Sequence, residues 1–390
     1  MKELSKNINA QEITGKHADE NFINSQITFA LKLFQNIVNK SNSKQNILIS
    51  PYSVVQALGM LANGANGSTK TQIEKTISNM PIEDFNQYLY MHRISQPNTK
   101  NCKLMTANSI WIRDNEFMQI KKDFLQTNAN YYNSSIFTDL FDDSTVTDIN
   151  KWVNKHTNTM ISKLLDEISD EAILYLINAI AFHAKWQTPY ELYQVQNGKF
   201  KNANGKEQTV KMMHSMEDDY LEDEYAIGFL KYYQGGRYAF MALLPNKNIS
   251  VIEYIKDLKL ENFRNLIYTK KTKDVIATMP KFSYDYDIKL SNILSAMGMP
   301  NAFDDKNADF SNIAEIENNS LAISEIMHKT HIDVFEDGTK ASAVTGDVAC
   351  AGCCSILERK TVILDRPFIY GILDTENNLP IFLGVLNSVN

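Results

Sequence analysis

The chain has 390 residues, 44% of them hydrophobic, and a formal net charge of −7. Its length exceeds the common size of one domain, but no linker rich in Pro, Gly or Ser divides it. We expect a polar extension over residues 1–21, and one large domain over residues 22–390. Residues 1–16 lack the apolar core of a secretion signal. The negative charge without a basic cluster argues against nucleic acid as a partner, and no apolar run reaches the roughly 18 residues of a membrane span.

Hydrophobic periodicity organises the first half of the chain. It predicts helices over residues 22–40, 54–62, 69–77 and 146–165. It predicts strands over residues 46–53, 104–113 and 172–182. Pro51 breaks the first of these strands, and Ser53 is the expected N-cap of the helix that follows. The third strand is almost continuously apolar, which is typical of a strand covered on both faces.

The second half is richer in strands. Alternating or continuous apolar runs predict strands over residues 210–213, 227–233, 237–245, 275–282, 321–335 and 361–364. One helix is expected over residues 289–297. Because short helices come first and strands dominate later, we expect an α+β protein rather than a regular βαβ array.

Residues 336–354 form an unusual stretch. It begins with an acid and a glycine, continues with small and β-branched residues, and ends in thiols. A loop of this length inside a compact domain is usually functional or disordered. Thr339, Ala341, Ala343 and Thr345 alternate as small residues, which suits the crowded face of a pleated strand. We therefore expect an exposed loop that is able to become a strand.

This stretch also resembles a known family. Glu336-Asp337-Gly338-Thr339, followed by Ala341-Ser342-Ala343-Val344, is similar to the hinge of the inhibitory serpins, which inhibit serine proteases by a conformational change. Residues 366–370 and 379–387 resemble the strands that follow the reactive loop in that family. The resemblance covers the chain from about residue 22 onward. It implies a serpin fold, in which helices pack on three β-sheets. A reactive-centre loop over about residues 336–360 would then be able to insert into the main sheet.

The resemblance also implies functional residues at three places. The hinge residues are Glu336, Gly338, Thr339, Ala341, Ala343 and Thr345. A polar cluster beneath the main sheet, called the shutter, consists of Ser50, Ser53, Asn178 and His328. The entrance of the sheet, called the breach, contains Trp186 and the pair Lys281 and Glu336. Judged from the residues alone, Ser50 and Ser53 are turn or cap residues and His328 is a structural strand histidine.

The reactive bond is placed by counting from the hinge. The spacing of the family gives Gly352–Cys353, within a window from Ala351 to Cys354. These residues are small and uncharged, so they suit the shallow specificity pocket of an elastase-like or subtilisin-like protease. Arg359 lies too far along the chain to be the bait.

These features predict an irreversible suicide inhibitor of serine proteases with no catalytic residues of its own. Insertion of the loop would trap the acyl-enzyme. No cofactor is expected, and we expect a monomeric, extracellular protein. Two alternatives stay open, an inhibitor of papain-like cysteine proteases and a non-inhibitory carrier of the same fold. The main argument for the carrier is Asp347, because insertion of the loop would bury the carboxylate of this residue. Lys340 replaces the usual acid of the family but points outward by alternation.

The four cysteines are candidates for a metal or redox site. Cys350 and Cys353 form a CxxC pair beside Cys354, whereas Cys102 is isolated. A zinc or redox site would need a second ligand pair or a helix N-terminus that lowers a thiol pKa, and the sequence offers neither. No metal is therefore assigned, and a thiol enzyme is the least favoured alternative. A disulfide between Cys350 and Cys353 would kink the loop.

Overall fold

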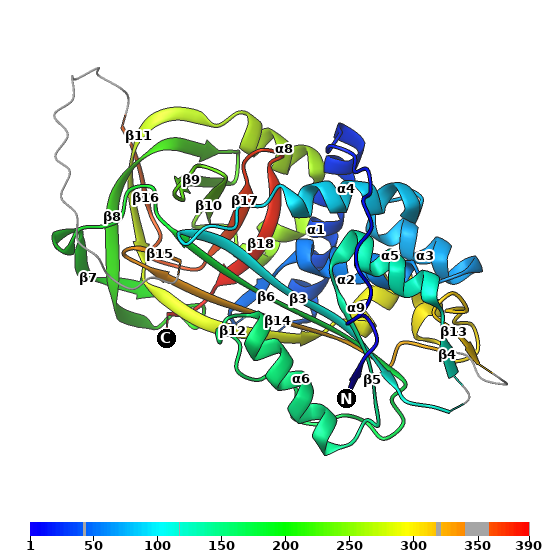
Figure 1. The fold of residues 1–390 in the computed structure, drawn as a ribbon. Helices are drawn as coiled ribbons and strands as arrows, with labels where there is room; N and C mark the ends of the chain where they lie inside the picture. The colour runs from blue at the N-terminus through cyan, green and yellow to red at the C-terminus, as the bar shows by residue number, and fades with distance from the viewer. Residues whose placement is uncertain (42–43, 117, 317–320, 340–358, 390) are drawn as a thin grey trace.

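The structure is a computed structural model, and it describes residues 1–41, 44–116, 118–316, 321–339 and 359–389. Its architecture is α+β, as the sequence predicts, with helices packed on three sheets (Figure 1). The described helices are α1 (Glu20–Lys40), α2 (Pro51–Ala62), α3 (Gly67–Ile77), α4 (Ile82–Ile94), α5 (Lys122–Tyr132), α6 (Asp143–His156), α7 (Val251–Asp257), α8 (Leu260–Tyr268) and α9 (Ser291–Met297). No helix in these ranges is long and apolar enough to cross a membrane.

The main sheet has seven strands. In spatial order they are β1 (Lys2–Glu3), β5 (Ser135–Asp139), β3 (Cys102–Arg113), β6 (Leu174–Lys185), β15 (Gly338–Thr339), β14 (Glu325–Phe335) and β12 (Phe282–Lys289). Strands β6 and β14 are parallel and pair directly along part of their length. The two-residue strand β15 lies between them at one end.

The second sheet has nine strands. In order they are β16 (Lys360–Ile363), β11 (Lys271–Pro280), β8 (Glu207–Glu222), β9 (Ala226–Tyr232), β10 (Tyr238–Pro245), β17 (Phe368–Asp374), β18 (Leu379–Leu386) and β2 (Ile47–Ile49), and β7 (Val195–Lys201) pairs with β8. A third sheet consists of β4 (Met118–Ile120) and β13 (Ala314–Ile316).

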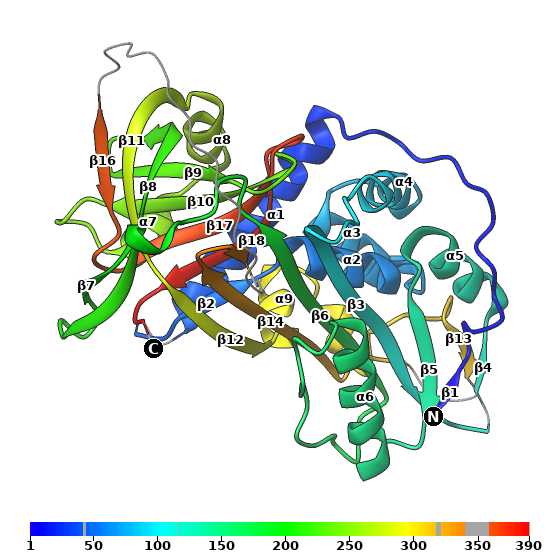
Figure 2. The ribbon, with the colours of Figure 1, turned by 60° about the vertical axis from the view of Figure 1, so that its left-hand side comes forward.

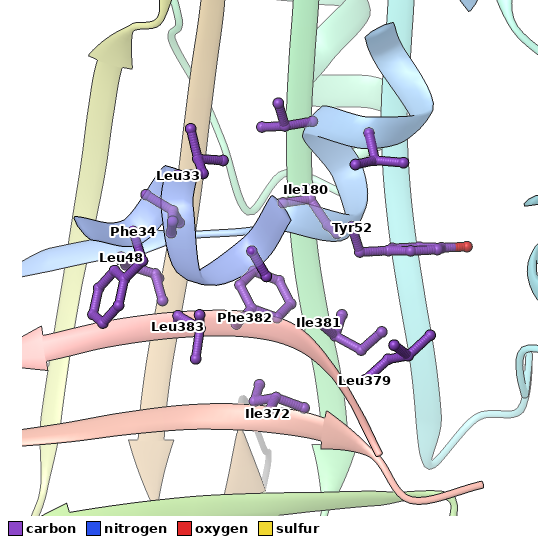
Figure 3. Close-up of a cluster of buried hydrophobic side chains, with 14 of the residues drawn as sticks. Leu33, Phe34, Leu48, Tyr52, Ile180, Ile372, Leu379, Ile381, Phe382 and Leu383 are labelled. Atoms are coloured by element: carbon purple, nitrogen blue, oxygen red, sulfur yellow. The ribbon is translucent and has the colours of Figure 1, made fainter. Parts of the chain in front are cut away.

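Two apolar cores hold these layers together. The larger core lies between α1, α2 and the inner faces of both large sheets (Figure 3). Its members in Figure 3 include Leu33, Phe34, Leu48, Tyr52, Ile180, Ile372, Ile381 and Phe382. The smaller core lies between α6 and the outer face of the main sheet and includes Trp111, Phe137, Ile149, Val153 and Tyr175. Helix α6 therefore covers the face opposite α2 (Figure 2).

Helices α2 and α6 differ most from the predicted boundaries. Helix α2 begins at Pro51, and its N-cap is Ser50 rather than Ser53, because the Ser50 hydroxyl accepts the backbone N–H of Ser53. Helix α6 ends at His156, nine residues before the predicted end at 165. Asn158 and Thr159 have positive φ angles of 49° and 63°, and such backbone ends a helix.

The first residues of the chain lie against the main sheet. Strand β1 pairs antiparallel with β5, and the amino terminus of Met1 lies 3.2 Å from Asp139 Oδ1. Further along, the backbone N–H of Lys16 donates to the carbonyl of Gln87 in α4. Figure 2 shows this segment passing along one side of the molecule before it enters α1.

Candidate functional site

The hinge begins inside the main sheet. Strand β15 runs antiparallel to both neighbours: Thr339 is opposite Val334 of β14 and Ala184 of β6. Gly338 has φ 151°, and a Cβ there would lie 2.1 Å from the carbonyl oxygen of Ala184. Only glycine fits this close approach, so Gly338 allows the chain to turn from β14 into the space between the strands.

Thr339 is fully buried on the covered face of the sheet. Its exposed fraction is 0%, and its hydroxyl oxygen lies 2.8 Å from the hydroxyl oxygen of Tyr233. Burial holds the pKa of Tyr233 well above its usual value, so this phenol stays protonated. The phenol and the threonine therefore satisfy each other in an apolar setting. The small polar side chain at this position is thus matched to a specific partner.

Trp186 fixes the turn that leads into β15. Its indole N–H donates to the backbone carbonyl of Phe335 at 2.8 Å, and its backbone N–H donates to the backbone carbonyl of Asp337 at 2.9 Å. The backbone N–H of Tyr190 donates to the carbonyl of Glu336, also at 2.9 Å. Three donors from one segment thus hold the turn between β14 and β15.

An ion pair stands beside this turn. Lys281 Nζ lies 2.5 Å from Glu336 Oε1, and both side chains are partly exposed. Partial burial raises the pKa of Glu336, but the hydrogen bond and charge of Lys281 and a backbone hydrogen bond together leave the pKa below its ordinary value. An exposed pair of this kind contributes about 0–1 kcal/mol. The breach residues expected from the resemblance are thus brought together around the start of the hinge.

A buried lysine completes the breach and was not expected from the sequence. Lys231 is only 2% exposed, and its Nζ lies 2.8 Å from Glu217 Oε1. The same ammonium lies 4.4 Å from the ring centroid of Tyr190 and 5.4 Å from that of Trp186. Burying this charge is tolerated because it is paired and covered by two aromatic faces. The only signal in the sequence is a lysine within the otherwise apolar strand β9.

The shutter lies deeper, where β6 and β14 pair directly. His328 and Asn178 are opposite each other in the register and both are fully buried. The Nδ1 of His328 bonds to Asn178 Oδ1, and its Nε2 accepts the backbone N–H of Ser50 at 3.1 Å. Burial lowers the pKa of His328 to about 3, so the imidazole is neutral. With Nε2 as acceptor, Nδ1 carries the proton and donates to Asn178.

The remaining shutter contacts link the sheet to α2. The side-chain amide of Asn178 donates to the backbone carbonyl of Ser53 at 2.9 Å and to its hydroxyl. It also donates to Asn108 on β3, which in turn donates to Gln56 of α2. Asn108 and Gln56 were not expected from the sequence. The four predicted shutter residues do lie together, in a network that spans β3, β6, β14 and α2.

The rest of the expected site cannot be placed. The hinge residues Ala341, Ala343 and Thr345, the predicted reactive bond between Gly352 and Cys353, the window residues Ala351 and Cys354, and Cys350 all lie outside the described residues. Cys102 is described and buried at the start of β3, and burial raises the pKa of its thiol to about 11. It is therefore a protonated, unreactive thiol at neutral pH. Among the described residues, no group of three or more His, Cys, Asp or Glu side chains is arranged to hold a metal ion.

Comparison with known proteins identifies the family. The family profile named serpin (serine protease inhibitor) matches residues 24–389. The thermophilic serpin tengpin in its native state superposes with a TM-score of 0.94 at 45% identity, covering 100% of both chains. Tengpin in its latent state gives a TM-score of 0.85 at 44% identity, covering 97% of this chain and 100% of that one.

Two curated proteins extend this similarity. An uncharacterized serpin-like protein of Methanosarcina acetivorans is 30% identical over 371 residues, which are 91% of this chain and 85% of that protein. Leukocyte elastase inhibitor A of Mus musculus is 28% identical over 386 residues, 94% of this chain and 98% of that protein. The family profile spans almost the entire chain, and the entrance of the main sheet already holds Gly338 and Thr339 of the hinge. This protein therefore belongs to the serpin family, whose members are generally protease inhibitors.

Proposed function

We propose that this serpin is an irreversible suicide inhibitor of serine proteases with a shallow specificity pocket, elastase-like or subtilisin-like. The protease attacks the reactive loop near Cys353 and forms an acyl-enzyme. The cleaved loop then enters the main sheet as a new strand between β6 and β14 and carries the protease with it. The inhibitor acts as a monomer and outside the cell.

One observation carries this proposal: β15 already lies between β6 and β14, antiparallel to both. The alternative, a carrier that never inserts its loop, has no need for this arrangement. Insertion continues a strand that has begun, so no new strand must be nucleated. Gly338 supplies the bend, and the buried Thr339 sets the phase in which alternate residues face the core.

The register of β15 specifies where later residues would lie after insertion. Thr339 pairs antiparallel with Val334 and with Ala184. Each residue further along the loop would therefore pair with a residue one position earlier in β14 and one position earlier in β6. Continued along both strands, this register puts Thr345 opposite His328 and Asn178. The hydroxyl of Thr345 would then replace the hydrogen bond between the two shutter residues, which must part to admit the loop. The shutter is thereby rearranged without leaving its polar groups unpaired.

The same register gives Asp347 a less favourable position. After insertion it would lie opposite Ile326 and Leu176, which are 1% and 0% exposed. A carboxylate has no partner in that apolar setting, so it resists burial or must become protonated. The last part of insertion is therefore slowed, and some inhibitor is cleaved without trapping the protease.

The driving force comes from forming the new strand. Roughly a dozen additional backbone hydrogen bonds at about 1 kcal/mol each give on the order of 10 kcal/mol. Breaking the parallel pairing between β6 and β14 offsets part of this gain. The native state is thus a kinetically trapped state with stored free energy, a recognised way to build a switch.

The proposal is tested by incubating the full chain with elastase or subtilisin and separating the products on a denaturing gel. We expect a band at the summed mass of the two proteins that survives denaturation, and mass spectrometry of the released peptide gives its first residue. Cleavage near Cys353 without a stable adduct, together with unchanged heat stability of the cleaved protein, would contradict the proposal and favour a carrier.

A further inference from the structure

Three apolar side chains stand exposed in a row on the second sheet. Met216 of β8, Ile276 of β11 and Ile363 of β16 are 55%, 39% and 45% exposed. We call these three residues the apolar strip. Met216 and Ile276 are directly opposite in the antiparallel pairing of β8 and β11. Ile276 is opposite Thr361, two residues from Ile363, in the parallel pairing of β11 and β16.

The strip occupies one face of three paired strands. The residues that alternate with it, Val275, Ala277 and Val362, are at most 1% exposed, so the opposite face is packed into the core. Charged groups border the strip, since Arg359, which has the same phase along the chain as Thr361 and Ile363, pairs with Asp274 at 3.9 Å. An apolar centre with a charged rim is the usual anatomy of a protein interface.

The position of the strip next to the reactive loop indicates which protein would bind it. Strand β16 directly follows the reactive loop, and Lys360 comes seven positions after Cys353. Even when fully extended, seven residues span at most about 25 Å. A protease domain of about 230 residues has a radius of gyration of about 17 Å and so a diameter of roughly 45 Å. The face formed by β16, β11 and β8, whose strands lie side by side in Figure 2, is therefore within reach of a protease bound near Cys353.

We infer that the apolar strip is a secondary docking surface for the attacking serine protease, which adds contacts beyond the loop itself. The inference rests on the proposed function, because the protease must first be drawn to the loop. A few buried apolar side chains can dominate an interface, so the strip would lengthen the life of the encounter complex and favour acylation. It would also make the intact protein a better target than its loop sequence alone.

The test measures the rate at which the protease attacks the loop, whether the attack ends in cleavage or in a stable adduct. The full chain and the variants Met216→Asp, Ile276→Asp and their combination are treated with elastase and with subtilisin, and kcat/KM for loop cleavage or adduct formation is compared. The matched control is Leu140→Asp, an apolar-to-acid change at a residue that is 65% exposed and follows β5, remote from β16 in Figure 1. A synthetic peptide of residues 340–358 reports the preference for the loop sequence alone.

We expect kcat/KM of the double variant to fall about tenfold, mainly through a higher KM. The control Leu140→Asp should react at the same rate as the unmodified protein. All variants should unfold at the same temperature. The free peptide should be cleaved more slowly than the intact unmodified protein. Equal rates for the strip variants and the unmodified protein would overturn the inference, as would an equal loss in Leu140→Asp. Cleavage without adducts but with the strip effect preserved would refute the inhibitory function and leave the docking surface intact. If neither protease attacks the loop, both proposals fail.

Discussion

The hydroxyl oxygens of Thr339 and Tyr233 lie 2.8 Å apart on the covered face of the main sheet. One belongs to the second residue of β15 and the other follows the end of β9, so the contact joins the hinge to the second sheet. Trp186 stacks on Tyr233 with ring centroids 4.4 Å apart and binds the turn before the hinge. The entry of the chain into the main sheet at β15 is therefore a defined, hydrogen-bonded arrangement.

Replacing Thr339 should convert the inhibitor into a substrate. Thr339→Arg puts a charge where the exposed fraction is 0%, and its burial without a partner opposes insertion. We expect loop cleavage at the normal rate and at least about a tenfold rise in the number of inhibitor molecules consumed per protease trapped. Titration of protease activity measures this ratio. Thr339→Ala is the control and should stay inhibitory; loss of adducts in both variants would show that size and charge are not the cause.

Asp347→Ala should improve inhibition. If insertion continues the register of β15, Asp347 would come to lie between Ile326 and Leu176, where a carboxylate is costly and a methyl group is not. We expect fewer molecules consumed per protease trapped, measured by the same titration. The matched control is Lys340→Ala, because alternation would point Lys340 to the outer face of the inserted strand. An equal improvement in both variants would contradict the register.

Lowering the pH should reduce the stability of the folded protein through His328. Burial lowers its folded pKa to about 3, below the unfolded value of 6.5, so the unfolded chain binds the extra proton between these two values. This contribution to stability is complete above pH 6.5 and is lost as the pH falls toward 3, by about 1.4 kcal/mol per pH unit. Thermal unfolding at pH 7, 6, 5 and 4 measures it. The variant His328→Gln should show a shallower fall, and equal slopes would refute this assignment.

His331 should act in the opposite direction. His331 forms the last residue pair between β14 and β6. Its Nδ1 lies 2.6 Å from Asp285 Oδ1 on β12, and its Nε2 lies 3.0 Å from Asp333 Oδ2. Burial lowers the pKa of His331, but hydrogen bonds to the two carboxylates outweigh it and raise the pKa to about 9. The stabilisation is complete below pH 6.5 and is lost as the pH rises through 9. Unfolding temperatures from pH 7 to 10 should fall more steeply for the unmodified protein than for His331→Asn.

The ion pair of Lys231 and Glu217 should stabilise only as a pair. Glu217→Gln leaves a buried ammonium without its counter-charge, and we expect a loss of about 3–5 kcal/mol. The double change Lys231→Met and Glu217→Leu removes both charges and should recover much of that loss. Denaturant unfolding of the single and double variants completes the cycle. A double variant as unstable as Glu217→Gln would show that packing, rather than charge, dominates this site.

The sequence determined the class of the fold and predicted a hinge. Periodicity located α1, α2, α3, α6 and α9 and long strands such as β3, β6 and β10, because burial of alternate or every third to fourth residue follows from local geometry. It did not predict α4, α5, α7 or α8. The alternation of small residues from Thr339 onward predicted a segment able to become a strand, and the position of Thr339 in β15 agrees with that phase.

Only the tertiary structure decided the rest, because the remaining features depend on contacts between residues far apart in the chain. It selected Ser50 rather than Ser53 as the cap of α2, where the same hydroxyl also donates to the carbonyl of Ile381. It put a lysine of β9 against Glu217 of β8, and it set the register of β15 against two strands at once. Local propensity cannot specify such pairings, since they arise when the sheets and helices close on a common core.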